Sequence, residues 1–327
     1  MGQLNLRTRQ LSRRFGTRIG VDALTFDAER GEVLGLLGPN GAGKTTTIRL
    51  LSTVLAPTSG EFSVAGIPSS QPAEIRRRVG VLPESAGYPR HQTGLEYLTY
   101  YARLFGHNHA DAIRTATGLL DEFGLTERAA SPISIYSRGM RQRLGIARAL
   151  VNDPDVVFLD EPTLGLDPAG QLQILHAVRE VAARRGATVV LSTHMLAEVE
   201  AVCSKVLILD RGRMLKWSTV AEVTAAVGAP RSAVIRVPLE QVGAARQAVG
   251  ALPGRTVAAA EERPDVLRVT SSASSDGMNA VLQELVRAGV PILGFEVEGT
   301  RLTDAYLSLT RDSGAHTGAD AETEVVR

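Results

Sequence analysis

The chain has 327 residues, of which 44% are apolar and 22% are charged, a composition typical of globular proteins. This length accommodates two domains, each with its own core. The formal net charge is +1, so no basic excess over the whole chain indicates binding to nucleic acid, and we expect no nucleic-acid partner. The single cysteine, Cys203, excludes an intrachain disulfide and is interpreted as a buried structural thiol in a reducing compartment.

The first two thirds of the chain alternate short apolar runs with helical patterns, which predicts an α/β domain. No apolar run approaches the roughly 20 residues needed to cross a bilayer. In chain order, the predicted strands are 31–38, 79–83, 156–159, 188–191 and 206–209. The predicted helices are 45–55, 95–105, 112–123 and 171–184.

The composition shifts after Trp217, and an alanine-rich segment with Gly228 and Pro230 predicts a linker over 221–231. Beyond it, the patterns indicate strand 233–237, helix 241–251, strands 256–260 and 266–270, helix 276–288 and strand 292–298. This β-α-β-β-α-β order is that of ferredoxin-like domains. We therefore expect a first domain over 1–220 and a small α/β domain over 232–310 that ends with a short helix, 302–309. The tail, 311–327, lacks apolar periodicity and is predicted to be disordered.

A glycine-rich motif stands between the first predicted strand and the following helix. It matches the pattern G-x-x-x-x-G-K-[ST], in which backbone N–H groups surround phosphate oxygens at a helix N-terminus. Lys44 can reach the β- and γ-phosphates of a nucleotide, and the Thr45 hydroxyl can bind Mg²⁺. The predicted phosphate-binding residues are Gly38, Pro39, Asn40, Gly41, Ala42, Gly43, Lys44, Thr45 and Thr46.

Two carboxylates, Asp160 and Glu161, follow the buried strand 156–159. Ligands of open α/β sheets bind at the carboxyl ends of the strands. Asp160 is therefore a candidate to hold Mg²⁺ through water, and Glu161 to orient or deprotonate an attacking water. An Asp-Glu pair after a strand is common by itself, but together with the glycine loop it indicates a nucleotide-hydrolysing site.

With these motifs in place, the sequence resembles the ABC ATPase family over residues 4–214. The family's signature motif, Leu-Ser-Gly-Gly-Gln, is matched at 136–140 by Tyr-Ser-Arg-Gly-Met, which keeps Ser137 and Gly139. Ser137 can cap the following helix while offering its hydroxyl to a phosphate, and Gly139 permits close backbone approach. The resemblance implies a P-loop NTPase fold with a helical subdomain at about 84–152.

Further family elements occur in the expected order. Asp167, in 164–168, resembles the dimer-contact loop, and His194, in Ser-Thr-His, resembles the histidine that binds the γ-phosphate. Phe15 lies where the family often has an aromatic residue stacked on adenine, although a core position is an alternative. Glu84, in Leu-Pro-Glu, replaces the usual glutamine and adds a negative charge beside the phosphates.

The resemblance implies ATP hydrolysis with Mg²⁺ held by Thr45, Glu84 and Asp160 and with Lys44, Glu161 and His194 as the catalytic side chains. It also implies that Ser137, Gly139 and Asp167 act across a dimer with an identical or related chain. The partner would be an integral-membrane permease, which places this chain at the cytoplasmic face of the membrane as a peripheral subunit. The segment 302–310 and the small domain resemble ATPases of drug and antibiotic exporters of the daunorubicin-resistance type. This resemblance implies export of drugs, antibiotics or lipid-like compounds, with import as an alternative.

Two other classes of function remain open at this point. A non-transport ABC ATPase acting on nucleic acid or ribosomes usually carries two motif sets, a long coiled coil or zinc-binding cysteines, and this sequence has none of them. A regulatory module that binds ATP without hydrolysis would not need Glu161 and His194, and a phosphate-release assay separates it from an ATPase.

Overall fold

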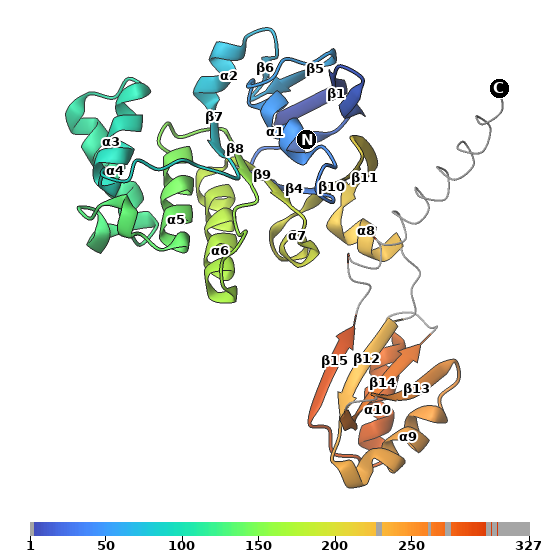
Figure 1. Cartoon of the computed structure of the whole chain (residues 1–327). Coiled ribbons are helices and arrows are strands. Elements are labelled where there is room, and N and C mark those ends of the chain that lie inside the picture. Colours follow the sequence, from blue (N-terminus) through green and yellow to red (C-terminus); the bar gives the residue numbers. More distant parts are fainter. Residues whose placement is uncertain are drawn as a thin grey trace, which may run out of the picture. The chain divides into compact units, whose positions relative to one another are not determined.

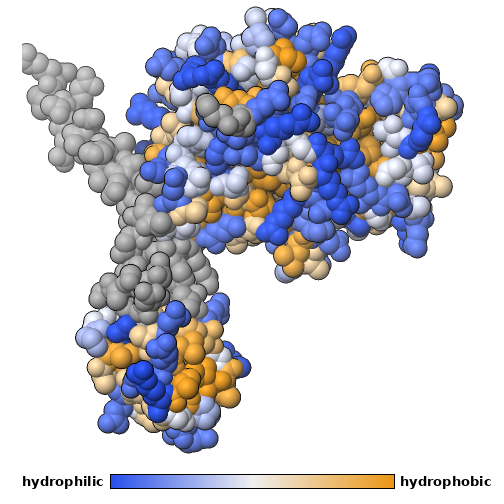
Figure 2. Space-filling model, turned by 180° about the vertical axis from the view of Figure 1, so that it is seen from behind, coloured by the Kyte–Doolittle hydropathy of each residue, from blue (hydrophilic) through white to orange (hydrophobic). Residues whose placement is uncertain are grey.

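The computed structural model describes residues 3–226, 231–260, 263–271, 276–298, 302 and 306 (Figure 1). The chain divides into two compact units, Met1–Val220 and Ala221–Arg327. No helix in the described ranges has the length and apolar character needed to cross a membrane. On the face opposite that of Figure 1, hydrophilic residues cover most of the first unit, with smaller hydrophobic patches between them (Figure 2).

In the first unit, eleven strands of the described residues form one sheet, in the order β6-β5-β1-β2-β11-β10-β4-β9-β8-β7, with β3 paired to β1. Strands β10, β4, β9, β8 and β7 are parallel, whereas β6, β5, β1 and β2 pair in antiparallel fashion. The bounds are β1 Leu4–Phe15, β2 Arg18–Leu24, β3 Asp27–Glu29, β4 Val33–Leu37, β5 Ser59–Val64, β6 Ile67–Pro68, β7 Val79–Leu82, β8 Val156–Asp160, β9 Thr188–Thr193, β10 Lys205–Asp210 and β11 Arg213–Thr219.

The parallel part of the sheet is covered on both faces. Every residue of β4, β8 and β9 is buried, as expected for parallel strands between two layers of helices. Figure 1 shows α1 (Lys44–Leu51) on one side of these strands, and α6 (Pro168–Arg185) and α7 (Leu196–Val202) on the other. This arrangement places the ends of β4, β8 and β9 side by side, where the predicted site residues follow.

Three helices form a group beside the sheet, within the range predicted for a helical subdomain (Figure 1). They are α3 (Gly94–Leu104), α4 (His109–Glu122) and α5 (Arg138–Ala149), and two short 3₁₀ helices, Thr126–Arg128 and Ile133–Ile135, precede α5. Thr93 begins α3 with a capping box: its hydroxyl accepts from the Glu96 N–H at 3.1 Å, and its own N–H donates to the Glu96 carboxylate at 2.8 Å. Both helices predicted for this part of the chain, 95–105 and 112–123, are confirmed.

The second unit contains β12 (Arg231–Arg236), α9 (Val242–Gly250), β13 (Arg255–Ala260), β14 (Arg263–Ser271), α10 (Asp276–Arg287) and β15 (Gly294–Glu298). Its strands form an antiparallel sheet in the order β13-β14-β12-β15, which confirms the predicted β-α-β-β-α-β fold. Alternate residues of β12 are fully buried and pack with the apolar sides of α9 and α10; they include Ala233 and Ile235.

The helix after the glycine loop ends at Leu51 rather than near residue 55, so that prediction was too long. The segment 221–231, interpreted as a linker, contains most of α8 (Val220–Ala226), and its residues 227–230 lie outside the described ranges. The tail, 311–327, and most of the helix expected over 302–309 also lie outside them.

Cys203, which follows α7, is buried. Burial, with a smaller effect from the Glu198 carboxylate, raises the pKa of its thiol above the ordinary value. A thiol that stays protonated is a poor nucleophile and a poor metal ligand, which agrees with a structural role.

Candidate functional site

The glycine loop connects the buried strand β4 to α1. Gly41 and Gly43 have positive φ angles of 83° and 108°, which glycine adopts without strain. At Gly43, a Cβ atom would lie only 2.8 Å from the Gly20 carbonyl oxygen, so the close approach of β2 also requires glycine there. Gly43 caps α1 without a side-chain hydrogen bond. Because glycine has no side chain, Gly43 cannot accept from the first N–H groups of α1. These N–H groups favour binding of an anion at the helix N-terminus.

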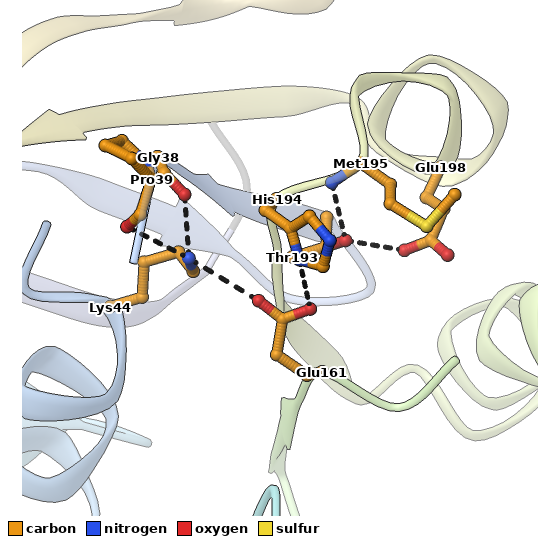
Figure 3. A network of polar contacts seen from close by, with 8 residues as sticks. All are labelled: Gly38, Pro39, Lys44, Glu161, Thr193, His194, Met195 and Glu198. Carbon is orange, nitrogen blue, oxygen red and sulfur yellow. Dashed lines mark hydrogen bonds and ion pairs between the residues drawn. The ribbon is translucent and has the colours of Figure 1, made fainter. Parts of the chain in front are cut away.

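Lys44 is buried, and its amine points back over the loop (Figure 3). The Nζ atom donates to the Gly38 carbonyl at 2.7 Å and lies 3.4 Å from both the Pro39 carbonyl oxygen and Glu161 Oε1. These contacts hold a positive charge between the glycine loop and the carboxylate at the end of β8. That position suits a group that binds the terminal phosphates of a nucleotide.

Glu161 and His194 meet because β8 and β9 are parallel neighbours, with Asp160 paired to Ser192. Glu161 follows β8 with a positive φ of 49°, a conformation that costs energy for a residue with a side chain. Its N–H donates to the Ser192 carbonyl at 2.9 Å. Its Oε2 atom lies 2.9 Å from His194 Nδ1 (Figure 3). The strained turn therefore directs the carboxylate toward both Lys44 and His194.

A cavity of about 540 Å³ opens at this end of the sheet. Phe15, at the end of β1, is 44% exposed, and the Arg13 guanidinium lies 4.9 Å from its ring centroid. An exposed aromatic face at a cavity can stack on a nucleobase. The predicted residues that line the cavity are Phe15, Pro39, Asn40, Gly41, Ala42, Gly43, Lys44, Thr45, Thr46, Glu84, Glu161 and His194.

Five further lining residues were missed by the sequence interpretation: Arg18, Ile19, Gly20, Arg49 and Leu164. Arg18 begins β2, and Arg49 lies on α1 one turn beyond Thr45. Both carry a charge that is complementary to phosphate. The position of Arg49 on the helix after the glycine loop was a usable signal, because residues four apart share one face of a helix.

The predicted residues Gly38 and Asp160 do not line the cavity themselves, but each directly precedes a residue that does, Pro39 and Glu161. Three other predicted residues lie near helix N-termini. Ser137 and Asp167 are exposed, at the N-termini of α5 and α6, and Gly139 lies on the first turn of α5. Ser137 accepts from the Met140 N–H, and Asp167 accepts from the Gly170 N–H, each at 3.2 Å. A Cβ atom on Gly139 would meet no described atom closer than 3.9 Å, so the surface there is open. None of the three residues lines the cavity of its own chain.

The oxygen donors predicted for Mg²⁺ come from separate elements. Thr45 lies in the first turn of α1, Asp160 is the buried last residue of β8, and Glu84 is exposed on the loop after β7. Among the described residues, no three His, Cys, Asp or Glu side chains are close enough to bind a metal ion. Mg²⁺ is usually held by one or two carboxylates together with substrate phosphates and water. The donor set therefore fits a metal that arrives with a nucleotide.

Comparison with known proteins identifies the family of this chain. The model of the "ABC transporter" family matches residues 21–164. The chain is 36% identical over 312 residues to the daunorubicin/doxorubicin resistance ATP-binding protein DrrA of Streptomyces peucetius, an alignment that covers 94% of this chain and 92% of that protein. The chain belongs to the ABC transporter ATP-binding protein family. It is thus an ATPase subunit of the kind that powers transport.

Two further relatives of this ABC ATPase are informative. It is 39% identical over 226 residues to the Nod factor export ATP-binding protein I of Burkholderia pseudomallei (strain 1710b), covering 69% of this chain and 71% of that one. Among solved structures, cbiO1 of Clostridium perfringens, part of the ABC transporter complex cbiONQ, aligns with a TM-score of 0.63 and 25% identity. That alignment covers 68% of this chain and 91% of cbiO1.

Proposed function

We propose that this ABC ATPase hydrolyses ATP in the cavity at the end of β4, β8 and β9, and that it powers an exporter of drugs, antibiotics or lipid-like compounds. The observation that carries the catalytic assignment is the contact of Glu161 with both Lys44 and His194, at 3.4 and 2.9 Å. One carboxylate is thereby placed between a cation suited to phosphate and an imidazole.

Each of the three side chains has a distinct role in this proposal. Lys44 binds the β- and γ-phosphates. The phosphates replace its present contacts with the Gly38 carbonyl and the Glu161 carboxylate. Glu161, freed from Lys44, orients the attacking water and accepts its proton. His194 donates from Nδ1 to the Glu161 carboxylate and, as an imidazolium with both ring nitrogens protonated, donates from Nε2 to the γ-phosphate. Water attack then needs no large rearrangement, because β8 and β9 fix both residues.

Mg²⁺ would be held by Thr45, Asp160 and Glu84 together with the phosphates. When bound, it supplies charge that stabilises the transferring phosphoryl group. Glu84 differs from the glutamine that is usual in the family by a full negative charge, and it lines the cavity.

We infer that two chains act together. Ser137 and Asp167 are exposed, Gly139 is half-buried, and none of the three lines the cavity of its own chain, so a second copy or a related chain would bring them to the nucleotide. The γ-phosphate then has donors on every side, which is the main source of rate enhancement in phosphoryl transfer.

The permease partner, the cytoplasmic face of the membrane and the export direction rest on relatives. DrrA is named for resistance to daunorubicin and doxorubicin, protein I for Nod factor export, and cbiO1 as part of an ABC transporter complex. Two measurements test the proposal. Purified chain should release phosphate from ATP, and affinity capture from membranes should recover a multi-span protein that changes this rate. A chain that binds ATP without releasing phosphate, even with its membrane partner, would instead be a regulatory binding module.

Phe15→Ala should raise the KM for ATP by about 5- to 150-fold and leave kcat almost unchanged, because base–aromatic stacking contributes about 1–3 kcal/mol. The measurement is steady-state phosphate release over a range of ATP concentrations. Phe15→Trp keeps an aromatic face and is the matched control. Equal KM values for the alanine variant and the wild type would show that Phe15 does not contact the base.

Glu84→Gln should raise the free Mg²⁺ concentration needed for half-maximal turnover by a few-fold, since the site loses one negative charge near the cation. A titration of ATPase activity with Mg²⁺ measures this change. Glu127→Gln removes the charge of an exposed residue that does not line the cavity, and it is the control. An unchanged or lower Mg²⁺ requirement would remove Glu84 from the proposed metal-binding residues.

A further inference from the structure

Glu198, on α7, is a buried carboxylate that the proposed chemistry does not use. It is 3% exposed, and its Oε2 atom accepts from the Thr193 hydroxyl at 2.7 Å. Its Oε1 atom has no hydrogen-bond partner within the described residues. Burying a carboxylate destabilises a protein unless its oxygens are fully bonded, and an apolar residue at such a position is often more stabilising. Stability alone therefore gives a poor account of Glu198.

The Thr193 hydroxyl links Glu198 to the turn that carries His194. Thr193 is the fully buried last residue of β9, and its Oγ1 atom also accepts from the Met195 N–H at 3.0 Å (Figure 3). This side-chain bond closes a tight turn with His194 at its centre. A hydroxyl has one proton and two lone pairs. Because the hydroxyl proton is donated in the hydrogen bond to Glu198, a lone pair of Oγ1 is directed to the Met195 N–H.

The His194 side chain is 46% exposed, so packing does little to orient it. Its position is set by the backbone turn on one side and by the Glu161 carboxylate, 2.9 Å from Nδ1, on the other. The contacts thus form one series, from Glu198 through Thr193 and the His194 turn to Glu161 and Lys44 (Figure 3). Only the last members of this series line the cavity.

We propose that Glu198 is a positioning residue for ATP hydrolysis, which acts by orienting the Thr193 hydroxyl and so fixing the turn that presents His194 to Glu161. This inference rests on the proposed roles of Glu161 and His194. In this proposal Glu198, which lies outside the cavity, contributes to the rate of hydrolysis and does not contribute to the affinity for ATP.

Variants of both partners in this hydrogen bond test the proposal in the full-length chain. Glu198→Ala and Thr193→Val should lower kcat by about 10-fold, which corresponds to a 1.4 kcal/mol loss of transition-state stabilisation, with the KM for ATP within about two-fold of wild type. Glu198→Gln keeps an oxygen that accepts from Thr193, and Thr193→Ser keeps the hydroxyl. Both conservative variants should therefore retain turnover close to that of the wild type.

Three controls separate positioning from a general loss of structure. Glu200→Ala changes an exposed glutamate on the same helix and should leave turnover unchanged. Thermal unfolding of each variant gives the folded fraction, to which turnover is normalised. Finally, Glu198→Ala is combined with His194→Ala. If Glu198 acts through His194, the double variant should be no slower than His194→Ala alone, because residues that act as a unit are not additive.

The outcomes are distinct. Wild-type turnover per folded molecule in Glu198→Ala would overturn the proposal, and so would a further 10-fold loss when Glu198→Ala is added to His194→Ala. An equal loss in Glu198→Gln and Glu198→Ala would also contradict it, since the retained acceptor would then be irrelevant. If the wild-type chain itself releases no phosphate, the proposed function fails, and that result is separate from those of the variants.

Discussion

Replacing Glu161 with glutamine should lower ATP turnover by about 10²- to 10⁴-fold, the contribution of a positioned general base. Glutamine has nearly the same shape and keeps an oxygen near His194, but it cannot take a proton from water at neutral pH. It also removes the negative charge that lies 3.4 Å from the Lys44 amine. Binding of ATP should therefore persist or strengthen, because Lys44 no longer has a competing carboxylate.

The same variant reports on the proposed dimer. With hydrolysis blocked, ATP should remain bound between two chains, and light scattering or size-exclusion chromatography should show a dimer with ATP and a smaller species without it. Glu127→Gln, an exposed substitution, serves as the control and should hydrolyse ATP normally. Unchanged turnover in Glu161→Gln would refute the assignment of this carboxylate, whatever the dimer measurement shows.

Lys44→Ala should reduce turnover by at least about 10²-fold, comparable to the loss of a donor that stabilises transition-state charge. It should also weaken binding of ATP, since the buried amine is the cation of the glycine loop. Removal of one partner from a buried ion pair leaves Glu161 with an unbalanced charge, which by itself destabilises the chain. Thermal unfolding should therefore accompany a nucleotide-binding assay and phosphate release.

A matched substitution distinguishes the specific effect of Lys44 from the loss of any positive charge. Lys216 is exposed on β11, and Lys216→Ala should retain both affinity and turnover. If Lys44→Ala bound and hydrolysed ATP like the wild type, the cavity at the end of β4 would not be the nucleotide site.

The glycine loop and the carboxylates after β8 were predictable because their signals are local. A loop with glycine at positions of positive φ, such as Gly41 and Gly43, followed by a helix start, is readable from a few residues. The strands that precede the site contain runs of apolar residues, so their carboxyl ends, and thus Glu161 and His194, could be placed at one edge of the sheet. The ferredoxin-like order of the second unit was predictable for the same reason, since its strands and helices have clear periods.

The antiparallel strands of the first unit were not predicted. β1 (Leu4–Phe15) contains four arginines among its apolar residues and has irregular registers with β2 and β5, so its alternation is weak. Its partner strand β5 is distant in sequence, and such pairing depends on tertiary packing rather than on local pattern. Arg18, at the start of β2, was missed as a cavity residue for this reason.

The sequence by itself determined that this chain is an ATPase of the ABC family and that a small α/β unit follows, and it predicted the glycine loop and the carboxylates of the site, because these features are carried by local patterns and motifs. Only the tertiary structure decided how the side chains meet. The 3.4 Å contact of Lys44 with Glu161, the positive φ of Glu161 and the hydrogen bond from Thr193 to Glu198 depend on the pairing of β8 with β9 and on the packing of α7. Motifs specify which groups are present, whereas distances of a few ångströms are set by elements that are far apart in the chain.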